Sequence, residues 1–250
     1  MLTVTATGPA AQAKRTVPLL SLHSVSAGYG RIEIVADVQL EIHAGTVTAL
    51  LGPNGAGKTT TLGVLSGLIR PWTGCRHVAG RHANDATADE LARLGICMLR
   101  EGRSVFPNLS VSDNLLVATS AGARMRRIED VAYTLFPVLS ERRDQLAGTL
   151  SGGERQMLAL ARGLGVDPAV LLIDELSMGL APRVVGELYE AVARVADAGV
   201  AVFVVEQFAS VALKYADTAM VMTNGRITYA GAASGALEAA HRAYLGSESR

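Results

Sequence analysis

A glycine-rich segment between an apolar run and a helical pattern constrains this chain more than any other feature. Residues 52–59 read GPNGAGKT and fit the pattern G-x-x-x-x-G-K-[ST], with an apolar run over 47–51 before them and a helical pattern over 58–68 after them. Glycines let the backbone curl so that successive N–H groups and the positive end of a helix point at one anion. The segment therefore predicts a phosphate-binding loop where a strand meets a helix.

The residues of this loop have separate predicted roles. Lys58 is expected to reach the β- and γ-phosphates of a nucleotide, Thr59 to place its hydroxyl on Mg²⁺, and Thr60 to donate to a phosphate. The alternative is a tight glycine turn with an incidental lysine, which the flanking strand and helix disfavour. The predicted nucleotide-binding residues are Gly52, Pro53, Asn54, Gly55, Ala56, Gly57, Lys58, Thr59 and Thr60.

Two carboxylates follow a second apolar run. Residues 170–173 read VLLI and lead directly into Asp174 and Glu175. In parallel sheets, ligands bind at the edge formed by the carboxyl ends of the strands. Asp174 is suited to hold Mg²⁺ through water, and Glu175 to orient or deprotonate an attacking water. The alternative is a strand that ends in solvated acids, which is the weaker interpretation when a phosphate loop lies upstream.

The order of the remaining patterns predicts an α/β fold. Short β patterns cover 20–26, 38–42 and 47–51, with a turn at Gly28 and Gly30. Strands alternate with helices again after residue 168, and this alternation predicts a mainly parallel sheet covered on both faces. The helical segment 105–165 is expected to form a side lobe.

Composition limits the classes of partner. The 250 residues contain 23 Lys and Arg and 23 Asp and Glu, so the net charge is zero and nucleic acid is not expected as a partner. No apolar run approaches the roughly 18 residues that a membrane-spanning helix needs. The first 17 residues do not read as a signal peptide, and the two cysteines favour a reducing compartment. Membrane attachment is therefore expected to need a partner.

A second glycine pair opens a helix in the predicted side lobe. Residues 150–156 read LSGGERQ, followed by a helical pattern over 154–164. Because helix N-termini bind anions, Ser151, Gly152, Gly153 and Glu154 form a candidate second phosphate site. Two such sites on one rigid chain favour a head-to-tail dimer in which the second site of each chain covers the nucleotide of the other. An ordinary N-capped helix is the alternative.

With LSGGE added to the phosphate loop and the acidic strand end, the chain resembles the ATP-binding subunits of ABC transporters over about residues 20–246. The resemblance implies the ABC ATPase fold, a P-loop NTPase with a mainly parallel central sheet, an N-terminal antiparallel β subdomain and an inserted α-helical subdomain. It implies a single domain over 19–250, with a RecA-like core at about 19–104 and 166–250 and a helical subdomain at about 105–165. Residues 1–18 match nothing in the family and are expected to be a disordered extension.

Within that family the chain resembles the LivF-type subunits of branched-chain amino-acid importers, on EGRSVF at 101–106, SMGLAP at 177–182 and VEQ at 205–207. By this resemblance Glu101 replaces the Q-loop glutamine and is a candidate catalytic and metal-contacting residue. Gln207 replaces the switch histidine and would sense the γ-phosphate through amide hydrogen bonds. Tyr29 takes the place of the aromatic residue that stacks on adenine, with a surface tyrosine as the alternative. Residues 177–180 resemble the loop that crosses the dimer interface.

The resemblance also implies function, cofactors and partners. It implies an ATP-hydrolysing subunit, with ATP and Mg²⁺, that energises uptake of branched-chain or other hydrophobic amino acids. The implied partners are two transmembrane permease subunits, a second ABC ATPase or a second copy, and indirectly a periplasmic or lipid-anchored solute-binding protein. They place the chain at the cytoplasmic face of the membrane. The alternatives are a urea or amide importer ATPase, a non-transport ABC ATPase, or a hydrolysis-poor structural partner.

Two departures from the family pattern motivate the last alternative. Leu176 stands where the family usually has proline, so the loop that presents Glu175 is expected to be less rigid. Gln207 cannot titrate as a histidine does, so hydrolysis is expected to be slow or to depend on the partner's site.

Overall fold

A six-stranded sheet in the order β10-β9-β3-β8-β7-β6 forms the centre of the computed structural model, which describes residues 17–100, 102, 104–121 and 124–245. All neighbouring strands run parallel except those of the β9–β10 hairpin, which confirms the predicted mainly parallel sheet. The strands are β3 (Val47–Leu51), β6 (Ile96–Leu99), β7 (Val170–Asp174), β8 (Ala201–Glu206), β9 (Thr218–Thr223) and β10 (Arg226–Ala232).

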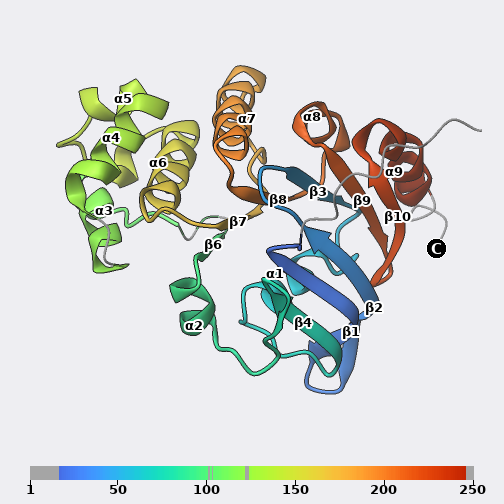
Figure 1. The fold of residues 1–250 in the computed structure, drawn as a ribbon. Helices are drawn as coiled ribbons and strands as arrows, with labels where there is room; N and C mark the ends of the chain where they lie inside the picture. Colours follow the sequence, from blue (N-terminus) through green and yellow to red (C-terminus); the bar gives the residue numbers. More distant parts are fainter. Residues whose placement is uncertain (1–16, 101, 103, 122–123, 246–250) are drawn as a thin grey trace, which may run out of the picture.

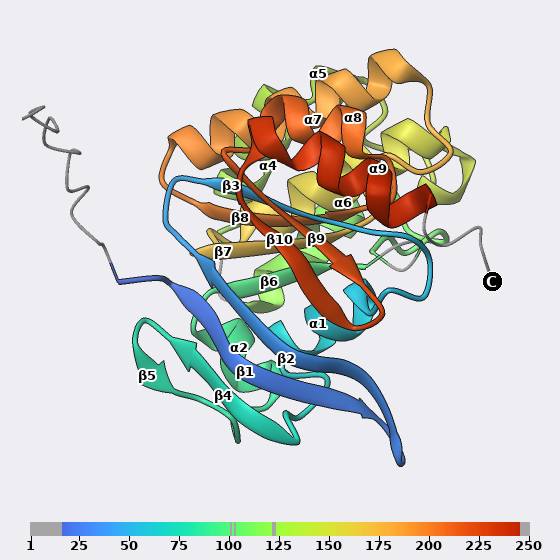
Figure 2. The ribbon, with the colours of Figure 1, turned by 90° about the vertical axis from the view of Figure 1, so that its right-hand side faces the viewer.

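Both faces of this sheet are buried. Along β7, Leu171 and Ile173 belong to one apolar core, whereas Val170 and Leu172 belong to a second core on the other face. Continuous apolar runs such as 170–173 are typical of strands buried on both faces. Figures 1 and 2 show α7 (Pro182–Asp197), α8 (Ala209–Tyr215) and α9 (Ala236–Leu245) over one face, and α1 (Lys58–Leu65) with a second sheet over the other.

The second sheet is antiparallel, as the family resemblance implies, in the order β2-β1-β4-β5. It is built from β1 (Leu20–Tyr29), β2 (Ile32–Ile42), β4 (Thr73–Val78) and β5 (Arg81–His82). The predicted β segments 20–26 and 38–42 were too short, and Gly28 lies inside β1 rather than in the turn. A Cβ on Gly28 would lie 1.9 Å from the carbonyl oxygen of Ile32, so this glycine permits a close approach of two strands. Local patterns do not distinguish that role from a turn.

The helical lobe lies beside the central sheet (Figure 1). Ser110 caps the first of its helices, because its hydroxyl accepts a hydrogen bond from the Asp113 amide at 3.0 Å. No helix within the described part of the chain is long and apolar enough to cross a membrane. The predicted limits of the lobe, 105–165, stay a prediction. The described residues within them form four α-helices: α3 (Val111–Val117), α4 (Met125–Leu135), α5 (Pro137–Glu141) and α6 (Gly152–Gly165).

Arg76 joins the antiparallel sheet to α1. Its fully buried guanidinium donates to the carbonyl oxygens of Val64 at 2.5 Å, Ala83 at 2.6 Å and Ala86 at 2.7 Å. Val64 lies in the last turn of α1, where carbonyl groups have no partner within the helix. Arg76 therefore fixes the far end of the helix that begins at the glycine loop.

Replacing Arg76 with methionine is expected to lower the free energy of unfolding by about 3 kcal/mol, because several buried carbonyls lose a charged donor. Denaturation by urea, followed by circular dichroism, measures the change. Arg81→Met, at an exposed position of β5, is the matched control and should shift stability by less than about 0.5 kcal/mol. Equal unfolding midpoints for the two variants would contradict the prediction.

Candidate functional site

The glycine loop and the predicted acids meet at one edge of the central sheet. Strand β8 lies between β3 and β7 and runs parallel to both, with Leu51 opposite Glu206 and Asp174 opposite Val205. The segments that follow these three strands therefore leave the sheet at the same edge, where ligands bind in such folds. The structure thus brings together the loop 52–57, the acidic strand end and Gln207.

Close packing leaves no room for a side chain at two positions of the loop. A Cβ on Gly52 would lie 2.3 Å from the carbonyl oxygen of Met222, and one on Gly57 would lie 2.8 Å from Cγ1 of Val35. Gly57 has φ +104° and caps the N-terminus of α1, which begins at Lys58 as predicted. The helix ends at Leu65 rather than at 68, because Gly67 adopts φ +79°.

The Lys58 side chain lies within the loop. Its Nζ donates to the carbonyl oxygens of Gly52 at 2.6 Å and Pro53 at 3.1 Å, and the residue is only 6% exposed. Burial lowers the pKa of Lys58, and the negative charges of Glu175, Asp174 and Glu206 act in the opposite direction. The lysine and these acids therefore belong to one electrostatic site.

Glu175 adopts a conformation that is unusual for a residue with a side chain. Its φ is +50°, in the left-handed region, and its backbone N–H donates to the carbonyl oxygen of Val205 at 3.0 Å. Such conformations cost free energy and cluster at functional sites. The bend follows directly on Asp174, which ends β7.

The Ser151–Glu154 segment forms a complete capping box at the start of α6. The Ser151 hydroxyl accepts from the Glu154 amide at 3.2 Å, and the Ser151 amide donates to the Glu154 carboxylate at 2.8 Å. Burial raises the pKa of Glu154, but the Ser151 hydrogen bonds and Arg142 outweigh it and keep that pKa below its usual range. Within one chain these are the contacts of an N-capped helix, and the second phosphate site stays a prediction.

The loop 177–180 lies beside this helix start. A Cβ on Gly152 would lie 3.3 Å from Cδ2 of Leu180, and one on Gly153 would lie 2.5 Å from Cγ1 of Val184 on α7. The two glycines therefore allow α6 to approach the loop and α7 closely. A cavity of about 500 Å³ opens there, and its lining includes Gly148, Gly152, Arg155, Gln156, Met178 and Gly179.

This geometry does not assign a role to Tyr29 or Glu101. Tyr29 ends β1 in the β1–β2 hairpin and is 56% exposed, which suits both a surface tyrosine and an adenine-stacking residue. Its role stays a prediction. Glu101, predicted as a catalytic and metal-contacting residue, lies outside the described residues.

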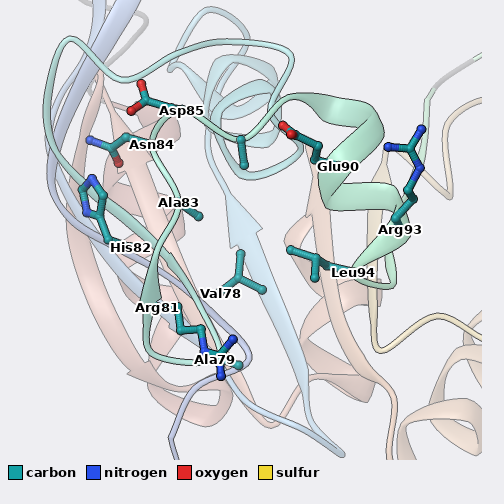
Figure 3. A pocket seen from close by; sticks show the side chains of 11 residues that line it. Val78, Ala79, Arg81, His82, Ala83, Asn84, Asp85, Glu90, Arg93 and Leu94 are labelled. Atoms are coloured by element: carbon teal, nitrogen blue, oxygen red, sulfur yellow. The ribbon is translucent and has the colours of Figure 1, made fainter.

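Another hollow, of about 750 Å³, lies between the β4–β5 hairpin and α2 (Ala88–Arg93) (Figure 3). The described lining contains none of the residues predicted to bind nucleotide. Acidic, basic and apolar side chains share its walls, among them Asp85, Arg93 and Leu94. This mixture does not select a ligand, so the hollow is not the candidate site.

The structure adds two residues that sequence reasoning missed. Glu206, the last residue of β8, is a carboxylate at the end of an apolar run, and that was the available signal. Tyr244 on α9 gave no local signal, because its partners are distant in sequence. Its hydroxyl donates to the carbonyl of Gln207 and accepts from the backbone N–H of Gly52. Burial raises the pKa of Tyr244, so the hydroxyl stays protonated.

Replacing Tyr244 with phenylalanine is expected to lower ATP turnover about fivefold, because the loss of a buried hydrogen bond costs about 1 kcal/mol and frees the Gln207 backbone. Steady-state ATPase assays measure this. Tyr229→Phe is the matched control, since that hydroxyl also donates to a backbone carbonyl, Ala232, at 2.8 Å, but on β10. The prediction fails if both variants lose the same turnover.

A glycine loop between β3 and α1, with a buried lysine and two carboxylates at the same sheet edge, defines a nucleotide-binding protein of the P-loop class. The profile of the ABC transporter family matches residues 35–177. The high-affinity branched-chain amino acid transport ATP-binding protein BraG of Pseudomonas aeruginosa is 41% identical over 212 residues, which cover 84% of this chain and 91% of BraG. The chain therefore belongs to the ABC transporter family, as an ATP-binding subunit that hydrolyses ATP.

Other relatives agree on the family. A probable branched-chain amino acid transport ATP-binding protein, LivF of Archaeoglobus fulgidus, is 34% identical over 88% of this chain and 94% of its own length. The lipopolysaccharide export system ATP-binding protein LptB of Acidithiobacillus ferridurans is 33% identical over 85% of this chain and 90% of its own. The ADP conformation of MJ1267, an ATP-binding cassette of an ABC transporter, superposes with a TM-score of 0.81 at 23% identity, over 92% of this chain and 100% of that one. This likeness confirms the predicted ABC ATPase fold.

Proposed function

We propose that this chain is the ATPase subunit of an importer of branched-chain or other hydrophobic amino acids. The observation that carries this proposal is the 41% identity with BraG over 91% of that protein. The importer-like stretches at 177–182 and 205–207 support it. Both lie at the sheet edge that also holds the glycine loop.

In this function each loop residue has a defined task. Backbone N–H groups of 52–57 and the Lys58 ammonium hold the β- and γ-phosphates of ATP, with Thr60 as a further donor. The Thr59 hydroxyl and the Asp174 carboxylate are oxygen donors of the kind that Mg²⁺ prefers, and Glu101 is a further candidate. Mg²⁺, when bound, neutralises phosphate charge that develops in the reaction.

Glu175 is the proposed general base. Its carboxylate takes a proton from a water whose oxygen bonds to the γ-phosphorus, while the bond from that phosphorus to ADP breaks. The left-handed bend at Glu175 and its proximity to the Lys58 charge support this role. Gln207 leaves the same edge of the sheet and supplies amide hydrogen bonds to the γ-phosphate.

Two ATPase subunits are proposed to close head to tail on two ATP molecules. Ser151–Glu154 of each subunit then covers the ATP of the other, and Tyr29 stacks on adenine in its own chain. The contact between the 177–180 loop and the start of α6 supports this, because it joins the two candidate interface segments. Closure on ATP and reopening after hydrolysis would move two permease subunits, which receive solute from a binding protein. The chain would thus work at the cytoplasmic face of the membrane.

Affinity isolation of the tagged chain from native membranes tests this function. We expect two multispanning subunits and a second ABC ATPase, or a second copy, to co-purify. Reconstituted in vesicles with the solute-binding protein, this complex should take up leucine when ATP is present. Similarity to LptB makes lipopolysaccharide export the second candidate. Co-purification with lipopolysaccharide export components, or recovery without any membrane subunit, would contradict the importer assignment.

A further inference from the structure

A buried carboxylate lies on β8, the strand between β3 and β7. Glu206 is 1% exposed and ends β8, next to Gln207. It accepts hydrogen bonds from the Ser177 amide at 3.0 Å, the Ser177 hydroxyl at 2.8 Å and the Tyr189 hydroxyl at 2.8 Å. Both carboxylate oxygens therefore have donors, and these donors come from the loop after β7 and from α7.

Burying a hydrogen-bond network of this kind costs free energy unless every polar group in it has a partner. A buried carboxylate loses its hydration, and burial accordingly raises the pKa of Glu206. A fully connected buried network rigidifies the segments that it joins. Tyr189 is itself held in place, because its ring stacks on Tyr215 at 5.3 Å between centroids. The network therefore gives the loop after β7 a fixed attachment.

The loop is attached to β8 at both ends of the segment 175–177. The Glu175 amide donates to the Val205 carbonyl at 3.0 Å, and Ser177 bonds to Glu206 as described. Between them, the side chain of Leu176 is only 2% exposed and packs into the apolar core. The sequence predicts a less rigid loop because proline is absent at 176. The hydrogen bonds of Glu175 and Ser177 and the packing of Leu176 restrain the loop instead.

We propose that Glu206 is a positioning residue for the Glu175 carboxylate. By holding Ser177 on β8 it sets the geometry of the three-residue segment that presents Glu175, and it supplies the restraint that a proline at 176 would give. The inference rests on the proposed role of Glu175 and is independent of the transported solute. It goes beyond that role because it assigns a function to a residue whose side chain bonds to Ser177 and Tyr189.

Replacing Glu206 with leucine tests this inference. Leucine has a similar volume but no acceptor, so the Ser177 amide, the Ser177 hydroxyl and the Tyr189 hydroxyl all lose their buried partner. We expect amide hydrogen exchange in a peptide covering 174–180 to become about tenfold faster, with exchange in β3 and α1 unchanged. ATP turnover of the full chain, in complex or alone, should fall about tenfold while the KM for ATP stays within about twofold.

A second substitution separates positioning from general stability. Adding Leu176→Pro to the Glu206→Leu variant should restore slow exchange in 174–180 and most of the turnover, because proline fixes φ and reduces the freedom of the loop. Glu190→Leu, at an exposed position of α7, is the matched control and should change neither quantity. If Glu206→Leu does not fold, Ser177→Ala removes only the hydroxyl donor and is measured in the same way.

Two outcomes would overturn the proposal. One is unchanged exchange in 174–180 in the Glu206→Leu variant, or in Ser177→Ala where the former does not fold. The other is a loss of turnover that Leu176→Pro leaves unrestored. Failure of the catalytic role of Glu175 is distinguishable, since a Glu175→Gln variant would then turn over ATP normally while the exchange measurement still decides whether Glu206 holds the loop.

Discussion

Glu175→Gln is expected to lower ATP turnover by about 100-fold or more while ATP still binds, because an amide cannot take the proton of the attacking water. The backbone contact of Glu175 with Val205 does not involve the side chain, so the loop should keep its left-handed bend. With hydrolysis blocked, ATP should accumulate in the closed dimer. Steady-state phosphate release and sedimentation in the presence of ATP and Mg²⁺ measure the two effects.

The matched control for this variant is Glu190→Gln on α7, which removes an exposed carboxylate distant in sequence from the glycine loop. It should retain turnover and give no ATP-dependent rise in dimer content. A Glu175→Gln protein that remains monomeric with ATP and turns it over at the parent rate would rule out Glu175 as the base.

The second large effect is expected for Lys58→Ala, which should weaken ATP binding roughly 100-fold and abolish turnover. The Lys58 ammonium is buried among carbonyl oxygens of its own loop and is the cation that the loop offers to the phosphates. A hydrogen bond to a charged group is worth about 1.5–3 kcal/mol, and the upper end of this range corresponds to about two orders of magnitude in affinity.

Titration calorimetry with ATP measures the Lys58→Ala effect directly, and the rise in melting temperature on adding ATP measures it through linkage. Lys214→Ala is the control, since Lys214 is exposed on α8 and lies over the ring of Tyr215. ATP should stabilise that variant as it does the parent chain. Equal stabilisation of Lys58→Ala would show that the glycine loop is not the phosphate site.

Features that depend on neighbouring residues could be predicted from the sequence. The strand, glycine loop and start of α1 form one short contiguous segment, because a phosphate cradle is built from successive backbone N–H groups. The residues that cap α3 and the apolar runs that predict a parallel sheet are also short contiguous patterns. Strand lengths were harder to predict. Gly28 is typical of a turn, and only the structure shows that it lies within β1 against Ile32.

The sequence by itself determined the family and the position of the glycine loop, because those are encoded in contiguous residues. Only the tertiary structure decided that Glu206 holds Ser177 and that Tyr244 of α9 reaches both Gln207 and Gly52. These contacts join strands and helices that are distant along the chain, and no local pattern specifies them. The physical reason is that a buried polar group must find its partner in three dimensions, wherever the packing of the sheet and helices places one.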